Sequence, residues 1–74
     1  MLKIYGKKLS LFSYRAKQLC KREKLSYTYK QLGKDFTKEE FLEKFPGAKT
    51  FPQIIMNGEK IGGYAELEIG RAHV

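Results

Sequence analysis

The sequence predicts a small α/β domain built on one mixed β-sheet with helices on both faces. Three observations support this fold class. The expected elements follow the order β-α-β-α-β-β-α, in which a βαβ unit precedes an antiparallel hairpin. The chain has 74 residues, which suits a single domain spanning 1–74 and is too short for a two-domain enzyme. Hydrophobic residues make up 42% of the chain, too large a share for a disordered tail.

The first half of the chain reads as a strand, a helix and a second strand. Residues 2–5 alternate apolar and polar side chains, which predicts a short strand. Ser10 is a candidate N-cap for an amphipathic helix over about 11–24. Residues 26–30 are rich in residues that favour strands and predict the second strand.

The start of the next helix carries the clearest local signal. Thr37 and Glu40 have the spacing of a capping box, and Phe36 and Phe41 occupy the two positions of a hydrophobic staple. The Pro-Gly pair at 46–47 ends the helix. The side chains expected on its buried face are Phe41, Leu42 and Phe45.

The last third of the chain predicts a β-hairpin followed by a short helix. Residues 53–56 and 59–61 are strand candidates joined by Asn57-Gly58. Asn-Gly tolerates positive φ at both central positions of a type I′ turn, so an antiparallel pairing is expected. A helix over about 64–69 completes the domain.

Residue counts exclude several classes of protein. The one cysteine, Cys20, cannot form an internal disulfide, and with the one histidine, His73, it cannot supply a zinc site, so no metal is expected. The longest apolar runs are far shorter than the ~20 residues of a membrane span. Residues 1–5 lack the apolar segment of a secretory signal. We therefore expect a soluble, cytoplasmic protein without a membrane partner.

Cys20 is expected to be a packing residue. It lies with Ala16 and Leu19 on the apolar stripe of the first predicted helix. Burial in that stripe would raise the pKa of the thiol and remove its reactivity.

The charge of the chain is uneven. Fifteen basic and eight acidic residues give a net charge of +7. Residues 1–34 hold ten basic residues and one acidic residue, a net charge of +9, so residues 35–74 sum to −2. This asymmetry indicates an anionic partner near the first half: nucleic acid, a membrane surface, an acidic protein or a small anionic ligand.

Three motifs in register resemble one protein family. Residues 50–55 read Thr-Phe-Pro-Gln-Ile-Ile, and Ile-Gly-Gly follows the turn at 61–63. The N-terminal half has Ile4-Tyr5, then Lys7, then a four-residue slot at 10–13. This pattern resembles the glutaredoxins over essentially the whole chain, and its short length is similar to the compact glutaredoxins of bacteria and their viruses. The resemblance implies a thioredoxin-like fold with a four-stranded mixed sheet.

The slot departs from the family pattern. Where glutaredoxins carry Cys-Pro-Tyr-Cys, this chain reads Ser10-Leu11-Phe12-Ser13. The resemblance places Ser10 at the nucleophilic cysteine and Ser13 at the resolving cysteine. The double change is either an engineered redox-dead form or a natural loss of chemistry, and we favour the first.

The chemistry at positions 10–13 explains which reaction is lost when serine replaces cysteine. A thiol at position 10 would lie at a helix N-terminus, three residues after Lys7, and would be a thiolate at neutral pH. A serine hydroxyl stays unionised there, and no histidine is placed to act as its base. We therefore expect no thiol–disulfide exchange from this chain, although it can still bind a ligand.

The resemblance also implies a ligand, glutathione. Lys7 and Lys49 would face its carboxylates, Pro52 would be cis and leave the Phe51 backbone free to pair with it, and amides after Gly63 would bind its glutamyl carboxylate. The family's aspartate, which contacts the glutamyl amine, is replaced by Ala65 unless Glu66 substitutes. The glutathione-binding set implied in this way is Lys7, Phe12, Lys49, Thr50, Phe51, Pro52, Gly63, Tyr64 and Ala65.

Three function classes are compatible with the sequence. The first is a glutathione-dependent thiol–disulfide oxidoreductase, here in a cysteine-free form. Its protein partners would carry disulfides, with ribonucleotide reductase a common one in the family. The second is a non-catalytic module that binds glutathione or a protein. The third is a basic nucleic-acid-binding domain whose aromatic residues lie among the cations of residues 1–34. We favour the first and expect a monomer. The missing cysteine ligand argues against iron–sulfur cluster assembly.

Overall fold

The four strands form one mixed sheet in the order β2-β1-β3-β4. They are β1 (Leu2–Gly6), β2 (Tyr27–Gln31), β3 (Gln53–Met56) and β4 (Glu59–Gly62). The central strand β1 runs parallel to β2 and antiparallel to β3, and β3 pairs with β4 as a hairpin. This computed structural model describes residues 1–72, so the expectation for His73 lies outside the described residues.

Three helices complete the order that the sequence predicts: α1 (Leu11–Arg22), α2 (Lys38–Lys44) and α3 (Tyr64–Ala72). α1 ends earlier than expected because Lys24 takes a left-handed φ of 56°. α3 runs past the expected end at Ile69. A single glycine such as Gly70 costs a helix only about 1 kcal/mol relative to alanine, so it does not stop this one.

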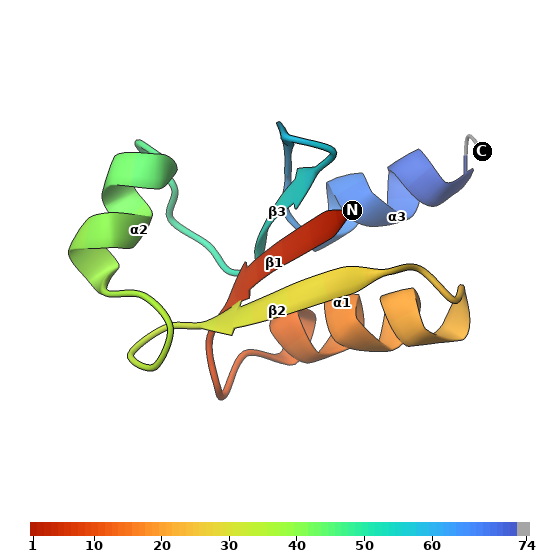
Figure 1. The fold of residues 1–74 in the computed structure, drawn as a ribbon, viewed down its shortest axis with the longest axis horizontal. Helices are drawn as coiled ribbons and strands as arrows, with labels where there is room; N and C mark the ends of the chain where they lie inside the picture. Colours follow the sequence, from red (N-terminus) through yellow and green to blue (C-terminus); the bar gives the residue numbers. More distant parts are fainter. Residues whose placement is uncertain (73–74) are drawn as a thin grey trace.

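Each face of the sheet has its own core. Ile4 and Ile54 point to one face, where they pack with Leu19 of α1 and Leu67 of α3. Figure 1 shows α1 and α3 on one side of the molecule and α2, in green, set apart at the other end. The prediction of a mixed sheet with helices on both faces is confirmed.

The opposite face is covered by an aromatic cluster that holds α2. Tyr5 lies edge-on to Phe36 and Phe45, with ring centroids 5.3 and 5.2 Å away. Phe41 stacks on Phe36 at 5.8 Å, as the predicted staple requires. The predicted capping box between Thr37 and Glu40 is also present. These contacts fix the start of α2, which forms one side of the candidate site.

The prediction that Leu42 of α2 belongs to the core is wrong. Leu42 is 42% exposed, whereas Phe41 and Phe45 are buried as expected. A helix of seven residues presents only a narrow stripe to the sheet, and the two phenylalanine side chains fill it. Leu42 is left at the edge of a groove described below.

The hairpin turn has the predicted backbone. Asn57 and Gly58 both have positive φ, 52° and 84°, as a type I′ turn requires. The turn sets the first pairs of β3 and β4, and a register shift between Ile54 and Ile55 then places Ile54 opposite Gly62 at the β4–α3 corner. Among residues 1–72, none of the helices is long and apolar enough to cross a membrane.

Candidate functional site

Ser10 caps the N-terminus of α1. Its backbone is extended, and its Oγ accepts a hydrogen bond of 3.2 Å from the amide of Ser13. The Ser10 amide donates to the Lys7 carbonyl at 3.3 Å, which closes the turn between β1 and α1. The half-buried side chain therefore lies where the free amides and dipole of a helix favour negative charge.

Ser13 lies beneath the surface in the first turn of α1. It is 1% exposed, and its Oγ accepts a hydrogen bond of 3.3 Å from the amide of Lys7. Burial raises the pKa of the neighbouring Tyr29 above its usual value, and the hydrogen bond to Ser13 partly offsets the rise. The two serines of the slot thus differ sharply in access: a ligand can reach Ser10 but not Ser13.

Gly6 makes this close packing possible. A Cβ at that position would lie 2.5 Å from the Tyr29 hydroxyl and 2.8 Å from Ser13 Oγ. Real Cβ contacts are not this short, so β1, β2 and α1 can meet here only around a glycine.

The loop before β3 faces the α1 N-terminus. The Phe51–Pro52 peptide bond is cis, as predicted, and Pro52 is buried. The side-chain amide of Gln53 donates to the Thr50 carbonyl at 3.0 Å and holds the loop. Within residues 1–72, the amide and carbonyl of Phe51 form no hydrogen bond with another residue. An extended ligand can therefore pair with the Phe51 backbone.

A groove of about 670 Å³ runs between the α1 N-terminus, α2 and this loop. We call it the lysine groove, because Lys7, Lys38 and Lys49 line it and no acidic residue does. Phe41 and Phe51 stack in it with centroids 4.4 Å apart. The groove therefore combines positive charge with an apolar surface.

A smaller hollow of about 260 Å³ adjoins the groove at the N-terminus of α3. We call it the α3 hollow. Phe12, Thr50 and Phe51 line both spaces, so the two form one continuous site. The predicted residues that line the α3 hollow are Phe12, Thr50, Phe51, Pro52, Gly63, Tyr64 and Ala65. The groove brings in Lys7, Ser10 and Lys49, which leaves only Ser13 outside the site.

The first amide at the α3 N-terminus, that of Gly63, is already bound within the protein. The carboxylate of Glu66 accepts a hydrogen bond of 2.7 Å from the Gly63 amide. It also fills the space beside Gly62, where an added Cβ would lie 2.5 Å from Glu66 Oε1. A capping side chain therefore already occupies the Gly63 amide, whereas the expectation that the amides after Gly63 bind the glutamyl carboxylate stays a prediction. The hollow also presents the Glu66 carboxylate.

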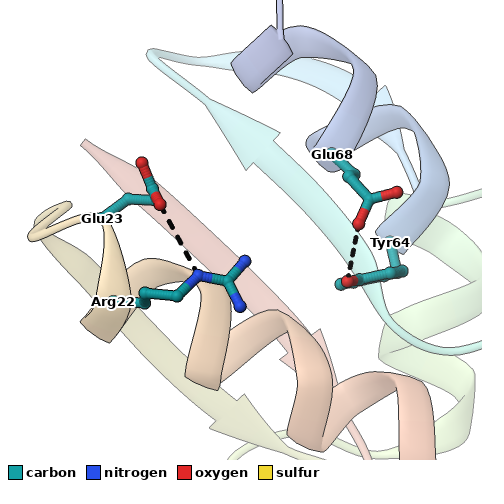
Figure 2. Close-up of polar contacts among 4 residues, drawn as sticks. All are labelled: Arg22, Glu23, Tyr64 and Glu68. Atoms are coloured by element: carbon teal, nitrogen blue, oxygen red, sulfur yellow. Dashed lines mark hydrogen bonds and ion pairs between the residues drawn. The ribbon is translucent and has the colours of Figure 1, made fainter.

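Tyr64 forms the wall of the α3 hollow opposite Phe12, with ring centroids 5.9 Å apart. Its hydroxyl donates to Glu68 at 3.0 Å, as Figure 2 shows. This hydrogen bond, with lesser contributions from burial and from the Glu68 charge, raises the pKa of Tyr64. The phenol stays neutral, and Glu68 fixes the ring along α3. The Arg22–Glu23 ion pair in the same view lies at the far end of α1.

Lys38 belongs to the site but was missed by sequence reasoning. It is the first residue of α2, directly after the N-cap Thr37, and it lines the lysine groove. The strong capping box fixed the start of α2 in the sequence. The sequence does not predict that the N-terminus of α2 lies beside the Thr50 loop, because this placement depends on the packing of the aromatic cluster.

Cys20 is expected to react slowly with iodoacetamide at pH 7 in the folded chain and quickly in urea. It is fully buried, and burial raises the pKa of its thiol, as predicted. Because the pKa of the Cys20 thiol is higher in the folded chain, its contribution to stability is fully present at pH values below the pKa of the unfolded chain. This contribution is lost as the pH rises through the pKa of the folded chain. The native rate should therefore rise at a higher pH than the rate in urea, as read by mass spectrometry. Rapid labelling at pH 7 without urea would contradict the burial of this thiol.

Comparison with known proteins supports the resemblance. The glutaredoxin family model matches residues 2–61. Reduced Escherichia coli glutaredoxin is 27% identical, with a TM-score of 0.76 over 97% of this chain and 93% of that one. Glutaredoxin 1 from Francisella tularensis, complexed with cacodylate, is 22% identical, with a TM-score of 0.83 over 97% and 92%, a likeness of fold. No curated protein matches. With a family model matched over most of its length, the chain belongs to the glutaredoxin family.

Proposed function

We propose that this chain keeps the glutathione site of a glutaredoxin but cannot carry out the thiol–disulfide chemistry. The observation that carries the proposal is the charge pattern of the continuous site. Lys7, Lys38 and Lys49 lie at one end, and Glu66 lies at the other. Glutathione has a glycyl carboxylate at one end and an ammonium group beside a carboxylate at its glutamyl end, so the lysines suit the first and Glu66 suits the ammonium.

The backbone contacts suit the same ligand. Glutathione is a short extended peptide, and the Phe51 amide and carbonyl are available to pair with it as an added strand would. Such a pose directs the glutathione sulfur toward the α1 N-terminus and Ser10. Glu66, already bound to the Gly63 amide, replaces the missing aspartate at Ala65 as the partner of the glutamyl amine.

The proposed loss of chemistry follows from the two serines. In a glutaredoxin, a thiolate at the Ser10 position attacks a disulfide sulfur, and a second thiol releases the resulting mixed disulfide. A hydroxyl at Ser10 is not ionised at neutral pH, and no histidine among residues 1–72 can deprotonate it. The activity of the family is the reduction of disulfides with glutathione. This chain, with serine at both positions, binds glutathione without reacting with a disulfide.

The nucleic-acid alternative ranks lower on the same structure. Of the aromatic residues that could stack on bases, Tyr5 is buried and Tyr29 carries the Lys17 ammonium 4.3 Å from its ring centroid. Phe12 and Tyr14 are the large exposed rings left in the basic half. Two exposed rings, of which Phe12 lines the ligand groove and Tyr14 does not, make a poor platform for a single strand.

A glutathione titration followed by backbone amide chemical shifts tests the proposal. We expect a dissociation constant in roughly the millimolar range, about −4 kcal/mol, that weakens with salt. The shifts should map to Lys7, Phe51 and Tyr64. Ala65→Asp should tighten binding severalfold, because it adds a second carboxylate for the amine at an exposed position.

Matched lysine variants serve as the control for this titration. Lys49→Gln removes a groove charge and should weaken binding, whereas Lys34→Gln removes a charge from an exposed loop and should not. Shifts confined to Arg15, Gln18 and Arg22 on the outer face of α1 would overturn the proposal in favour of the basic surface.

A further inference from the structure

The three lysines of the lysine groove are not neutralised by the protein itself. Among residues 1–72, no carboxylate lies within ion-pair distance of Lys7, Lys38 or Lys49. Lys7 instead holds its ammonium 5.6 Å from the centroid of the Phe51 ring, inside the groove. Three like charges around one concave surface repel one another and favour an occupant with several negative charges.

The same groove carries apolar surface that the core does not use. Leu42 is 42% exposed and Phe12 is 48% exposed, and both line the groove above the stacked Phe41 and Phe51 rings. Exposed apolar side chains that gather at one concave site are typical of a surface that binds another molecule.

Glutathione leaves part of this surface unused. With its ammonium group on Glu66, it has only its glycyl carboxylate for the three lysines, and it has no large apolar side chain to place against Leu42 and Phe41. An occupant with more carboxylates and an aromatic or aliphatic side chain would satisfy both features. The unpaired Phe51 backbone adds a third requirement, because it pairs with an extended main chain.

We propose that the lysine groove docks an extended acidic segment of a partner protein that carries an aromatic or aliphatic side chain. Its carboxylates lie on Lys7, Lys38 and Lys49, and its apolar side chain packs between Phe12 and Leu42. The segment therefore approaches Ser10 from the α2 side, while the α3 hollow stays open. The inference rests on the proposed function at one point, because glutathione and the acidic segment both pair with the Phe51 loop.

Fluorescently labelled, capped peptides provide the test. The sequence Glu-Glu-Phe-Glu-Glu should bind about tenfold more tightly than Gln-Gln-Phe-Gln-Gln, which lacks charge, and than Glu-Glu-Ser-Glu-Glu, which lacks the ring. Amide shifts should map to Lys38, Leu42 and Phe51, and affinity should fall as salt is raised. Equal binding of the uncharged peptide, or shifts that avoid α2, would overturn the proposal.

Two exposed positions give matched variants. Leu42→Ser should weaken binding of the acidic peptide severalfold, whereas Ile69→Ser, on an exposed α3 residue that does not line the groove, should leave it unchanged. If the peptide binds as expected and glutathione does not, the docking surface stands and the proposed glutathione site falls. If glutathione binds and the peptide does not, the docking surface alone is refuted.

Discussion

Replacing Ser10 with cysteine is expected to give this chain glutathione mixed-disulfide exchange. A thiol there would occupy the N-cap of α1, where Ser10 Oγ now accepts a hydrogen bond of 3.2 Å from the Ser13 amide. That amide, the helix dipole and Lys7 all stabilise the thiolate, so the pKa should fall from about 8.5 to below about 7. The pH dependence of iodoacetamide labelling measures this pKa, and reduction of a glutathionylated peptide measures the activity.

Ser13→Cys is the matched control for this gain of function. Its sulfur would be buried against Gly6 and Tyr29 and would face the Lys7 amide, so a substrate disulfide could not reach it. We expect labelling and exchange at least about a hundredfold slower than for Ser10→Cys, in line with the dependence of reactivity on thiolate access. Equal rates for the two variants would contradict the roles given to the two positions.

Phe41→Ala is expected to cause the largest loss of stability around the site. The Phe41 ring contacts Phe36, Phe45 and Phe51, and it joins α2 to the Thr50 loop. Its removal should cost about 3–5 kcal/mol of unfolding free energy, a large part of the total for a domain of this size. Urea denaturation followed by circular dichroism measures the change.

A milder substitution separates folding from binding. Phe41→Leu keeps most of the apolar volume, so it should cost about 1.5 kcal/mol or less and leave the chain folded. It should still weaken binding of the acidic peptide, because the stacking of Phe41 on Phe51 in the groove is lost. A Phe41→Ala chain as stable as the parent would show that the aromatic cluster does not hold α2 in place.

Local sequence patterns were sufficient to predict much of the fold. The capping box at Thr37 and Glu40 and the Asn57-Gly58 turn depend on residues close in sequence, and both formed as predicted. The burial of Cys20 followed from helical spacing alone. Contacts of this range are decided by backbone geometry and by one apolar stripe.

The site depended on tertiary packing that the sequence pattern does not contain. Leu42 has the spacing of a core residue, but the phenylalanines of α2 take the available space and leave it exposed in the groove. Lys38 is an ordinary first-turn lysine until the aromatic cluster sets α2 beside the Thr50 loop. The sequence offers Glu66 as a substitute for the aspartate missing at Ala65, yet the hydrogen bond between Glu66 and the Gly63 amide depends on the folded β4–α3 corner.

The rate at which the unaltered chain reduces a glutathionylated peptide tests the central claim most directly, namely that the site has kept its groove and lost its chemistry. The rate should equal that of glutathione alone, because Ser10 has no thiolate to offer and Cys20 is buried. A rate above this background that survives Cys20→Ala would mean that the hydroxyl site is itself reactive, and would contradict the account.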